Sequence, residues 1–153
     1  MNSNDHPLKT VATKILEDWA FMMVDPEESG EELLDLSSPL YLSCINIGGA
    51  FNGTILIMAR ESFISQLAIN LLGENDTTTI HEIDSHDAFR EMANVLAGNF
   101  ITTAYGADVS FDMLNPSVAL ATEDDLNKFK NSAHQFFFIA DDNLVGITFA
   151  IKN

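Results

Sequence analysis

The sequence has 153 residues, of which 46% are hydrophobic, and its net charge of −16 comes from 23 acidic and only 7 basic residues. This length and composition are typical of a single folded domain, 1–153, rather than of a disordered chain. So few cations cannot neutralise many phosphates. We therefore expect no nucleic-acid partner and no adhesion to an anionic membrane.

The one cysteine, Cys44, excludes an intramolecular disulfide and a cysteine-based zinc cluster. It lies in the apolar run YLSCINI, where we expect a buried, inert thiol. The N-terminal residues MNSNDHPLKT lack the apolar core of a signal peptide, and no run approaches the roughly 20 apolar residues of a membrane span. We therefore expect a soluble, cytoplasmic protein.

The first half of the chain is predicted to hold a helix, a hairpin and a second helix. Apolar residues recur every three or four positions over 8–24, which is typical of an amphipathic helix. The next segment, DPEESGEELLDLSSP, is predicted to be an acidic loop with a short helical turn. The β-rich runs 40–47 and 50–59 flank a Gly-Gly pair, which favours a hairpin. A helix over 61–72 then ends at Gly73.

The second half is predicted to hold a long helix over 85–105, capped by Ser85, and four strands. Strands over 108–114 and 118–122 are separated by the turn NPS. A short helix, EDDLNKFK, precedes the strands HQFFFIA and NLVGITFAI, the first of which is also a candidate edge strand for pairing with a second subunit. The order predicts an α+β fold, an antiparallel β-sheet with helices packed on one face.

Four residues of the long helix share one side. Successive helical residues advance by about 100°, so Glu91, Asn94 and Gly98 all fall within about 40° of Asp87, opposite the apolar stripe around Met92. An ordinary solvated helix face also shows such residues. However, Gly98 costs about 1 kcal/mol relative to Ala and removes a side chain beside Asn94, which favours a docking surface.

The segment DAFREMANVLAGNF resembles the helix motif of the CheC, CheX and FliY chemotaxis phosphatase family, and its core EMANVLAGN is most similar to CheX. The family motif is Asp or Ser, three residues, Glu, two residues, Asn and, about twenty-two residues later, Pro. Asp87, Glu91, Asn94 and Pro116 match it, with twenty-one residues before the proline, one fewer than usual. The resemblance implies a pseudo-symmetric CheC-like fold.

The resemblance also implies a function. The substrate would be a phosphorylated CheY-type response regulator, whose aspartyl phosphate the protein hydrolyses. Asn94 would position the attacking water, Glu91 would pair with the regulator's active-site Lys, and Asp87 and Gly98 would contribute to docking. The protein would need no cofactor or metal of its own, because Mg²⁺ is expected on the regulator. Members of the CheX branch are dimers, so a homodimer is expected.

The first helix is the place where a second copy of the motif is expected in CheC proteins. There Glu17 stands in the Glu place, but Ala20 occupies the Asn place, so the first copy lacks the amide. A single site on the later helix is what the resemblance to CheX implies.

Two alternatives to the phosphatase stay open: a non-catalytic CheC-like binding module for a response regulator or flagellar switch component, and an acidic interaction domain unrelated to signalling. The presence of both Glu91 and Asn94 favours the phosphatase. The segment HEIDSHD holds five potential metal ligands in seven residues, but its spacing matches no zinc motif, so a solvated helix entry is favoured over an ion site.

Overall fold

The protein forms one six-stranded sheet in which every pair of neighbouring strands is antiparallel. A computed structural model describes residues 6–27, 29–73 and 82–152. The helical elements are α1 (Pro7–Lys14), the π-helical turn η2 (Ile15–Trp19), the 3₁₀ turn η3 (Glu31–Leu33), α2 (Glu61–Leu72), α3 (Glu82–Tyr105) and α4 (Glu123–Lys130). The strands are β1 (Val24–Glu27), β2 (Leu40–Gly49), β3 (Asn52–Arg60), β4 (Phe111–Leu120), β5 (His134–Ala140) and β6 (Asn143–Lys152).

The strand order is β1-β5-β6-β3-β2-β4. Exchanging β1, β2 and β3 with β4, β5 and β6 gives the same order read backwards, so the two halves of the chain are related by a pseudo-twofold axis. That relation pairs α1 with α3 as the helix that precedes each edge strand. The predicted pseudo-symmetric α+β fold is confirmed.

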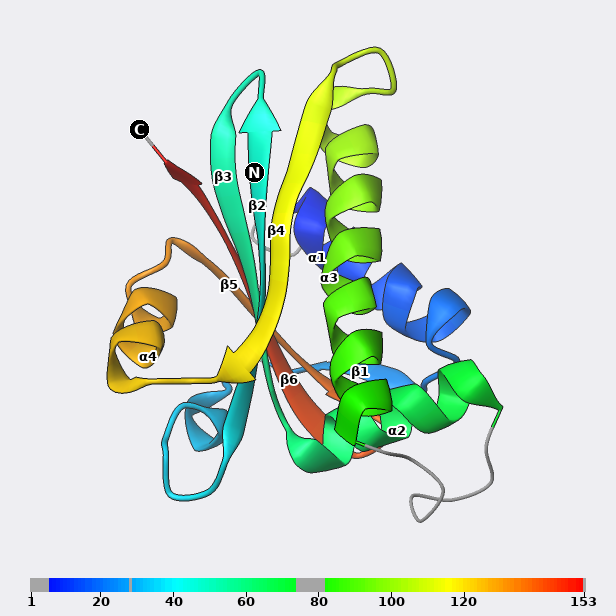
Figure 1. Cartoon of the computed structure of the whole chain (residues 1–153), viewed down its shortest axis with the longest axis vertical. Coiled ribbons are helices and arrows are strands. Elements are labelled where there is room, and N and C mark those ends of the chain that lie inside the picture. Colours follow the sequence, from blue (N-terminus) through cyan, green and yellow to red (C-terminus); the bar gives the residue numbers. More distant parts are fainter. Residues whose placement is uncertain (1–5, 28, 74–81, 153) are drawn as a thin grey trace.

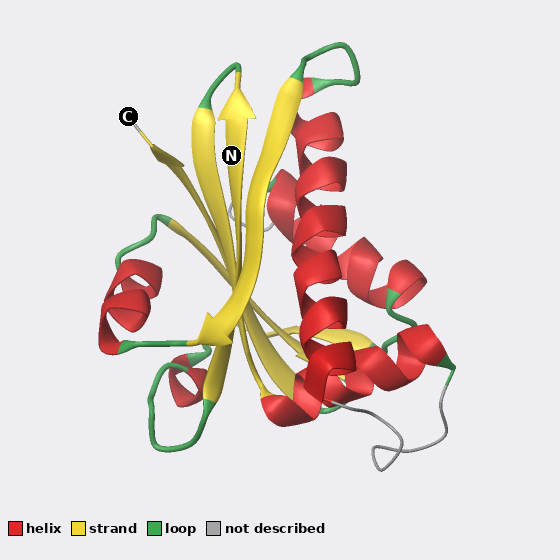
Figure 2. Ribbon diagram, in the orientation of Figure 1, coloured by secondary structure: helices red, strands yellow, loops and turns green. Residues whose placement is uncertain are grey.

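The helices α1, α2 and α3 cover one face of the sheet, and α4 with η3 covers part of the other (Figures 1 and 2). Alternating strand residues therefore enter two cores. The larger core, under α1–α3, includes Ile45, Ile55, Ile57, Phe136, Phe138, Val145 and Ile147. The smaller core includes Leu33, Leu40, Met58, Leu126, Phe129 and Phe137. The helices α1–α3 lie on one face as predicted, and α4 adds cover on the other.

The strands differ from prediction at both edges of the sheet. The predicted strands 108–114 and 118–122 are one strand, β4, because the NPS segment makes a bulge rather than a turn: between two paired positions the register advances by two residues on β2 but by three on β4. At the other edge, β1 forms inside the segment predicted to be a loop, and it pairs with β5. The interpretation of HQFFFIA as an edge strand is therefore wrong, because β5 lies between β1 and β6.

Both edge strands contain a proline, Pro26 in β1 and Pro116 in β4. Proline has no N–H to donate, so it is accommodated at edges and bulges and discourages pairing with a further strand.

Two predicted helix boundaries also change. The first helix ends in the π-helical turn η2, and Trp19 is its last residue. The long helix already includes Glu82, so Ser85 lies inside α3, where it is 5% exposed, and is not its N-cap. None of the described helices is both long enough and apolar enough to cross a lipid bilayer.

Candidate functional site

Helix α3 has one buried face and one open face. Its buried positions recur at helical spacing and consist of Ala88, Phe89, Met92, Ala93, Leu96, Ala97, Phe100 and Ile101. The hydroxyl of Ser43 on β2 is fully buried and donates to the Phe89 carbonyl at 2.9 Å, which ties the helix to the sheet. The predicted orientation is therefore confirmed, with Glu91 exposed and Asn94 half-buried on the open face.

Glu91 and Asn94 have unused hydrogen-bonding groups. Within the part of the chain that the structure describes, neither side chain makes a hydrogen bond or an ion pair. They lie three residues apart, so about 4.5 Å separates them along the helix axis. A carboxylate acceptor and a carboxamide with both donor and acceptor are thus presented side by side to another molecule.

Asp87 differs from its two neighbours because it is already paired. Arg90 Nη1 lies 2.8 Å from Asp87 Oδ1, and both side chains remain largely exposed. Arg90 is absent from the sequence-based set of site residues, although the spacing of three residues between opposite charges on a helix is a signal that indicates such a pair. The Asp87 carboxylate is therefore presented to a binding partner as an ion pair with the Arg90 guanidinium.

Gly98 lies where α3 meets the edge strand β4. A Cβ built on Gly98 would lie 3.8 Å from both Sδ and Cε of Met113, which is ordinary van der Waals contact. Packing inside the protein therefore does not demand glycine at this position. The absence of a side chain instead leaves open helix backbone next to Asn94, with the half-exposed Met113 beside it.

Pro116, the last residue of the sequence motif, lies in the bulge of β4. The preceding residue, Asn115, has a φ of 54°, in the left-handed region that Asn tolerates better than most residues. The bulge faces β2 between Cys44 and Asn46. Because β4 packs beside α3, the bulge places the motif proline on the strand next to the Glu91–Asn94 face.

The corresponding region of the first helix is built differently. Glu17 is exposed, but Ala20 is fully buried, and its carbonyl accepts a hydrogen bond from Asn70 Nδ2 at 2.9 Å. Position 20 thus faces the interior of the protein. The first helix presents a carboxylate without a neighbouring amide.

The HEIDSHD segment lies only partly within the described residues. His81 is outside them, whereas the His86 ring packs on Tyr41 with 5.3 Å between ring centroids. No group of three or more His, Cys, Asp or Glu side chains that could hold a metal ion occurs among the residues described.

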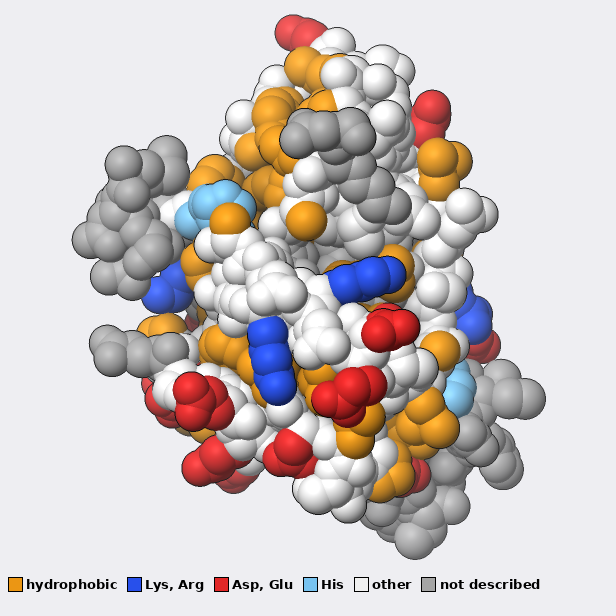
Figure 3. Space-filling model, turned by 90° about the vertical axis from the view of Figure 1, so that its left-hand side faces the viewer, with side chains coloured by type: hydrophobic (Ala, Val, Ile, Leu, Met, Phe, Trp, Pro, Cys, Tyr) orange, Lys and Arg blue, Asp and Glu red, His pale blue; other side chains and the backbone are white. Residues whose placement is uncertain are grey.

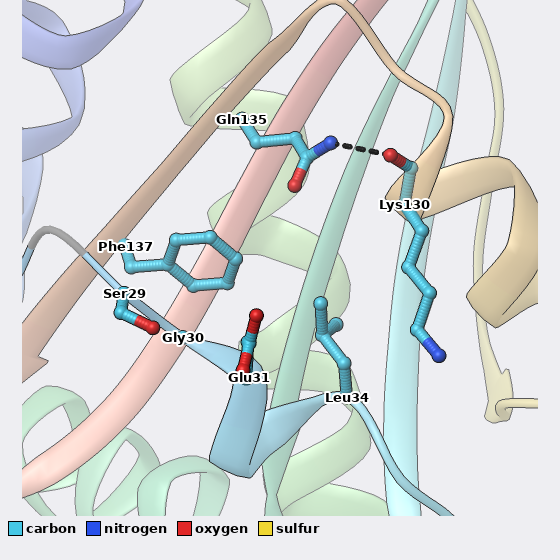
Figure 4. A pocket seen from close by; sticks show the side chains of 7 residues that line it. All are labelled: Ser29, Gly30, Glu31, Leu34, Lys130, Gln135 and Phe137. Carbon is cyan, nitrogen blue, oxygen red and sulfur yellow. Dashed lines mark hydrogen bonds between the residues drawn. The ribbon is translucent and has the colours of Figure 1, made fainter.

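A hollow of about 600 Å³ lies on the sheet face opposite α3, between η3 and the end of α4 (Figures 3 and 4). Gln135 extends toward it and donates through Nε2 to the carbonyls of Lys130 at 2.7 Å and Ser132 at 2.9 Å. Gln135 therefore satisfies carbonyl groups at and just beyond the C-terminal end of α4. The hollow is part of the packing of the smaller core, on the face of the sheet away from Glu91 and Asn94.

Comparisons with known proteins agree with this architecture. The family model described as "Chemotaxis phosphatase CheX" matches residues 41–140. The solved structure of CheX from Vibrio vulnificus is similar with a TM-score of 0.71 and 16% identity, covering 99% of both chains. CheX from Desulfovibrio desulfuricans gives a TM-score of 0.68 and 16% identity, covering 99% of this chain and 100% of that one.

A third similar structure is the CheX-CheY-BeF3-Mg²⁺ complex from Borrelia burgdorferi, with a TM-score of 0.64 and 18% identity over 96% of both chains. A comparison with curated protein sequences gives no match. At these identities the solved structures establish the fold, whereas the family model covers well over half of the chain.

Proposed function

The chain belongs to the chemotaxis phosphatase CheX family, and on that premise we propose that it accelerates hydrolysis of the aspartyl phosphate on a CheY-type response regulator in the cytoplasm. The Borrelia burgdorferi structure is a complex of CheX with CheY, BeF3 and Mg²⁺, which supports a regulator of this type as the partner. The observation that carries the proposal is the Glu91–Asn94 pair on the open face of α3, with no partner inside the described chain.

Asn94 is the proposed catalytic residue. Hydrolysis of an aspartyl phosphate is an in-line displacement in which water attacks phosphorus and the Asp carboxylate leaves, so catalysis depends chiefly on positioning. The Asn94 Oδ1 atom accepts a hydrogen bond from the attacking water, and its Nδ2 donates to a neighbouring acceptor. A carboxylate in its place would repel the phosphoryl oxygens.

Glu91 is the proposed docking residue next to Asn94. Its carboxylate pairs with the active-site Lys of the regulator, which fixes how deeply the helix enters and where Asn94 is held. Asp87 with Arg90 contacts the rim of the regulator, and Gly98 lets its surface approach the α3 backbone.

The proposed reaction needs no cofactor or metal held by this chain. Mg²⁺ belongs to the regulator, where it supplies charge compensation at the phosphoryl group. We further propose that the protein acts as a homodimer. The contact would not form by strand pairing at β5, because β5 is an interior strand of the sheet.

The experiment is a time course of dephosphorylation. CheY-type regulators from the same genome are phosphorylated with acetyl phosphate, and the lifetime of each phosphorylated form is measured with and without this protein. A shortened lifetime for at least one regulator is expected. Binding without a shorter lifetime would instead identify a non-catalytic binding module. If the protein neither bound any regulator nor shortened the lifetime of any phosphorylated form, that result would contradict the proposal.

A further inference from the structure

Two large apolar side chains point into solvent just after the first helix. Phe21 is 69% exposed and Met23 is 84% exposed, whereas their neighbours Ala20 and Met22 are 0% and 4% exposed. Burial thus alternates over four residues, with two anchored in the core and two turned outward. Such a pair of exposed apolar side chains has no role in the packing of the domain.

The backbone at Phe21 adopts an unfavourable conformation. Its φ of 57° lies in the left-handed region, which is uncommon for a bulky residue and is normally filled by glycine at the end of a helix. The π-helical turn imposes it: the Ala20 amide donates to the Ile15 carbonyl at 3.0 Å, and the Met22 amide donates to the Leu16 carbonyl at 2.9 Å. A glycine would remove the strain, so the aromatic ring is retained at a cost in stability.

Hydrogen bonds from two other elements hold this segment in place. Asn70 on α2 donates to the Ala20 carbonyl at 2.9 Å. Asp141, in the turn between β5 and β6, accepts from the Met23 amide at 2.9 Å and donates its own amide to the Met23 carbonyl at 2.9 Å. The backbone beneath both side chains is therefore fixed, which reduces the entropy lost when they bind another surface.

The surroundings of the two side chains are acidic. The segments that meet here, 15–27, 61–72 and 140–143, contain no Lys or Arg, and Lys14, one helical turn earlier, lines the same hollow as Glu17 and Asp18. The exposed carboxylates in and next to the helix end are Glu17, Asp18, Asp25, Glu27 and Asp142. Exposed apolar side chains flanked by carboxylates along the chain are complementary to an apolar pocket with a basic rim.

We propose that Phe21 and Met23, here called the Phe21–Met23 knob, form a docking site for a second protein that presents an apolar pocket rimmed by Lys or Arg. An anionic membrane would be repelled by these carboxylates. A second copy of this chain would bring the same carboxylates against one another. The knob precedes β1, at the edge of the sheet opposite β4, so it goes beyond the function proposed for Asn94.

The size of the knob defines the kind of contact. A Phe side chain buries about 150–250 Å², so a knob of two side chains suits a weak, reversible interaction rather than a permanent complex. Attraction between these carboxylates and a basic rim falls with ionic strength, so binding should weaken as salt is added.

The test uses a synthetic amphipathic helical peptide of leucine and lysine as the probe, titrated into the full-length protein and followed by backbone NMR shifts and fluorescence anisotropy. The test variant is Phe21→Gly combined with Met23→Ser. The matched control is Leu120→Ser, which removes a 57% exposed apolar side chain from β4 without changing the net charge.

The expected result is that shifts cluster at the knob and that the double variant binds the peptide at least tenfold more weakly, whereas the control binds as the unaltered protein does. The thermal midpoint of the double variant should not fall, because glycine relieves the backbone at position 21. Equal binding by all three proteins would overturn the proposal. The proposal would also be overturned if a peptide with glutamate in place of lysine bound as tightly as the lysine peptide. Self-association of the unaltered protein that is lost only in the double variant would overturn it too.

Discussion

The two halves of the molecule place different chemistry at pseudo-equivalent positions. In the second half, α3 continues past Asn94 for about three more turns, so Glu91 and Asn94 stand on regular helix. In the first half, the helix stops in a π-helical turn, and position 20 is buried while Phe21 and Met23 face solvent. One scaffold thus presents a polar pair at one edge and an apolar pair at the other.

This difference shows that the register of a helix end decides which residues are available to a partner. Glu17 and Glu91 are both exposed acidic residues on related helices. Only Glu91 has a neighbouring carboxamide on the same face, and only that combination suits a water-positioning role.

The largest expected effect among the docking residues is that of Glu91→Ala, tested against Glu17→Ala. Loss of a charge partner at an interface costs about 2 kcal/mol or more, so kcat/KM for regulator dephosphorylation should fall by about 30-fold or more in Glu91→Ala. Glu17→Ala should leave it unchanged. Equal losses in both variants would mean that the two halves contribute alike and would break the comparison.

Gly98→Ala should separate stability from activity. Alanine in a helix interior adds about 0.5–1 kcal/mol to the free energy of unfolding, and its methyl group would lie in ordinary contact with Met113. The same methyl obstructs a partner surface, so kcat/KM should fall about tenfold. Thermal melts and dephosphorylation time courses measure the two effects.

Asn99→Ala is the control for this substitution, because Asn99 is exposed on α3 but lies away from the line of Glu91 and Asn94. It too replaces a poorer helix former with alanine, and it should leave the rate unaltered. An unchanged rate in Gly98→Ala would show that the bare backbone has no part in docking.

The smallest expected effect concerns pH and lies in the first half. Burial, together with the neighbouring His134, lowers the pKa of His6 below its ordinary value of 6.5. The unfolded chain therefore binds this proton more readily than the folded one, so the contribution to stability is present above pH 6.5 and is lost as the pH falls below it.

His6 also caps α1, because its Nδ1 accepts from the Leu8 amide at 3.1 Å. Asparagine is an equally good cap without a titrating group. In urea melts, His6→Asn should thus show a shallower loss of stability between about pH 6.5 and pH 5 than the unaltered protein. Identical slopes would remove His6 as the source of the pH dependence.

The periodicity of apolar residues was sufficient to predict the helices and strands whose structure follows from their local sequence. The apolar residues of α3 recur at helical spacing, so both its existence and the outward direction of Glu91 and Asn94 followed from the sequence. The hairpin β2–β3 and the helix α2 are local for the same reason. Their apolar patterns need no distant partner to be interpreted.

Elements that depend on distant partners were missed. The segment VDPE is acidic, short and contains Pro26, and it becomes a strand only because β5 offers an edge on which to pair. The NPS segment has turn chemistry, yet pairing with β2 on both sides turns it into a bulge. Phe21 points outward because of the π-helical turn, and the spacing of apolar residues did not predict that turn.

The proposed mechanism depends on the carboxamide of Asn94, so the most direct measurement is the single-turnover dephosphorylation of a cognate regulator by saturating amounts of Asn94→Ala. Asn94 is half-buried outside the core, so the variant should fold normally and still bind the regulator in its BeF3-bound form. The proposed mechanism predicts that the rate falls to that of the regulator alone. An undiminished rate with the variant would contradict it.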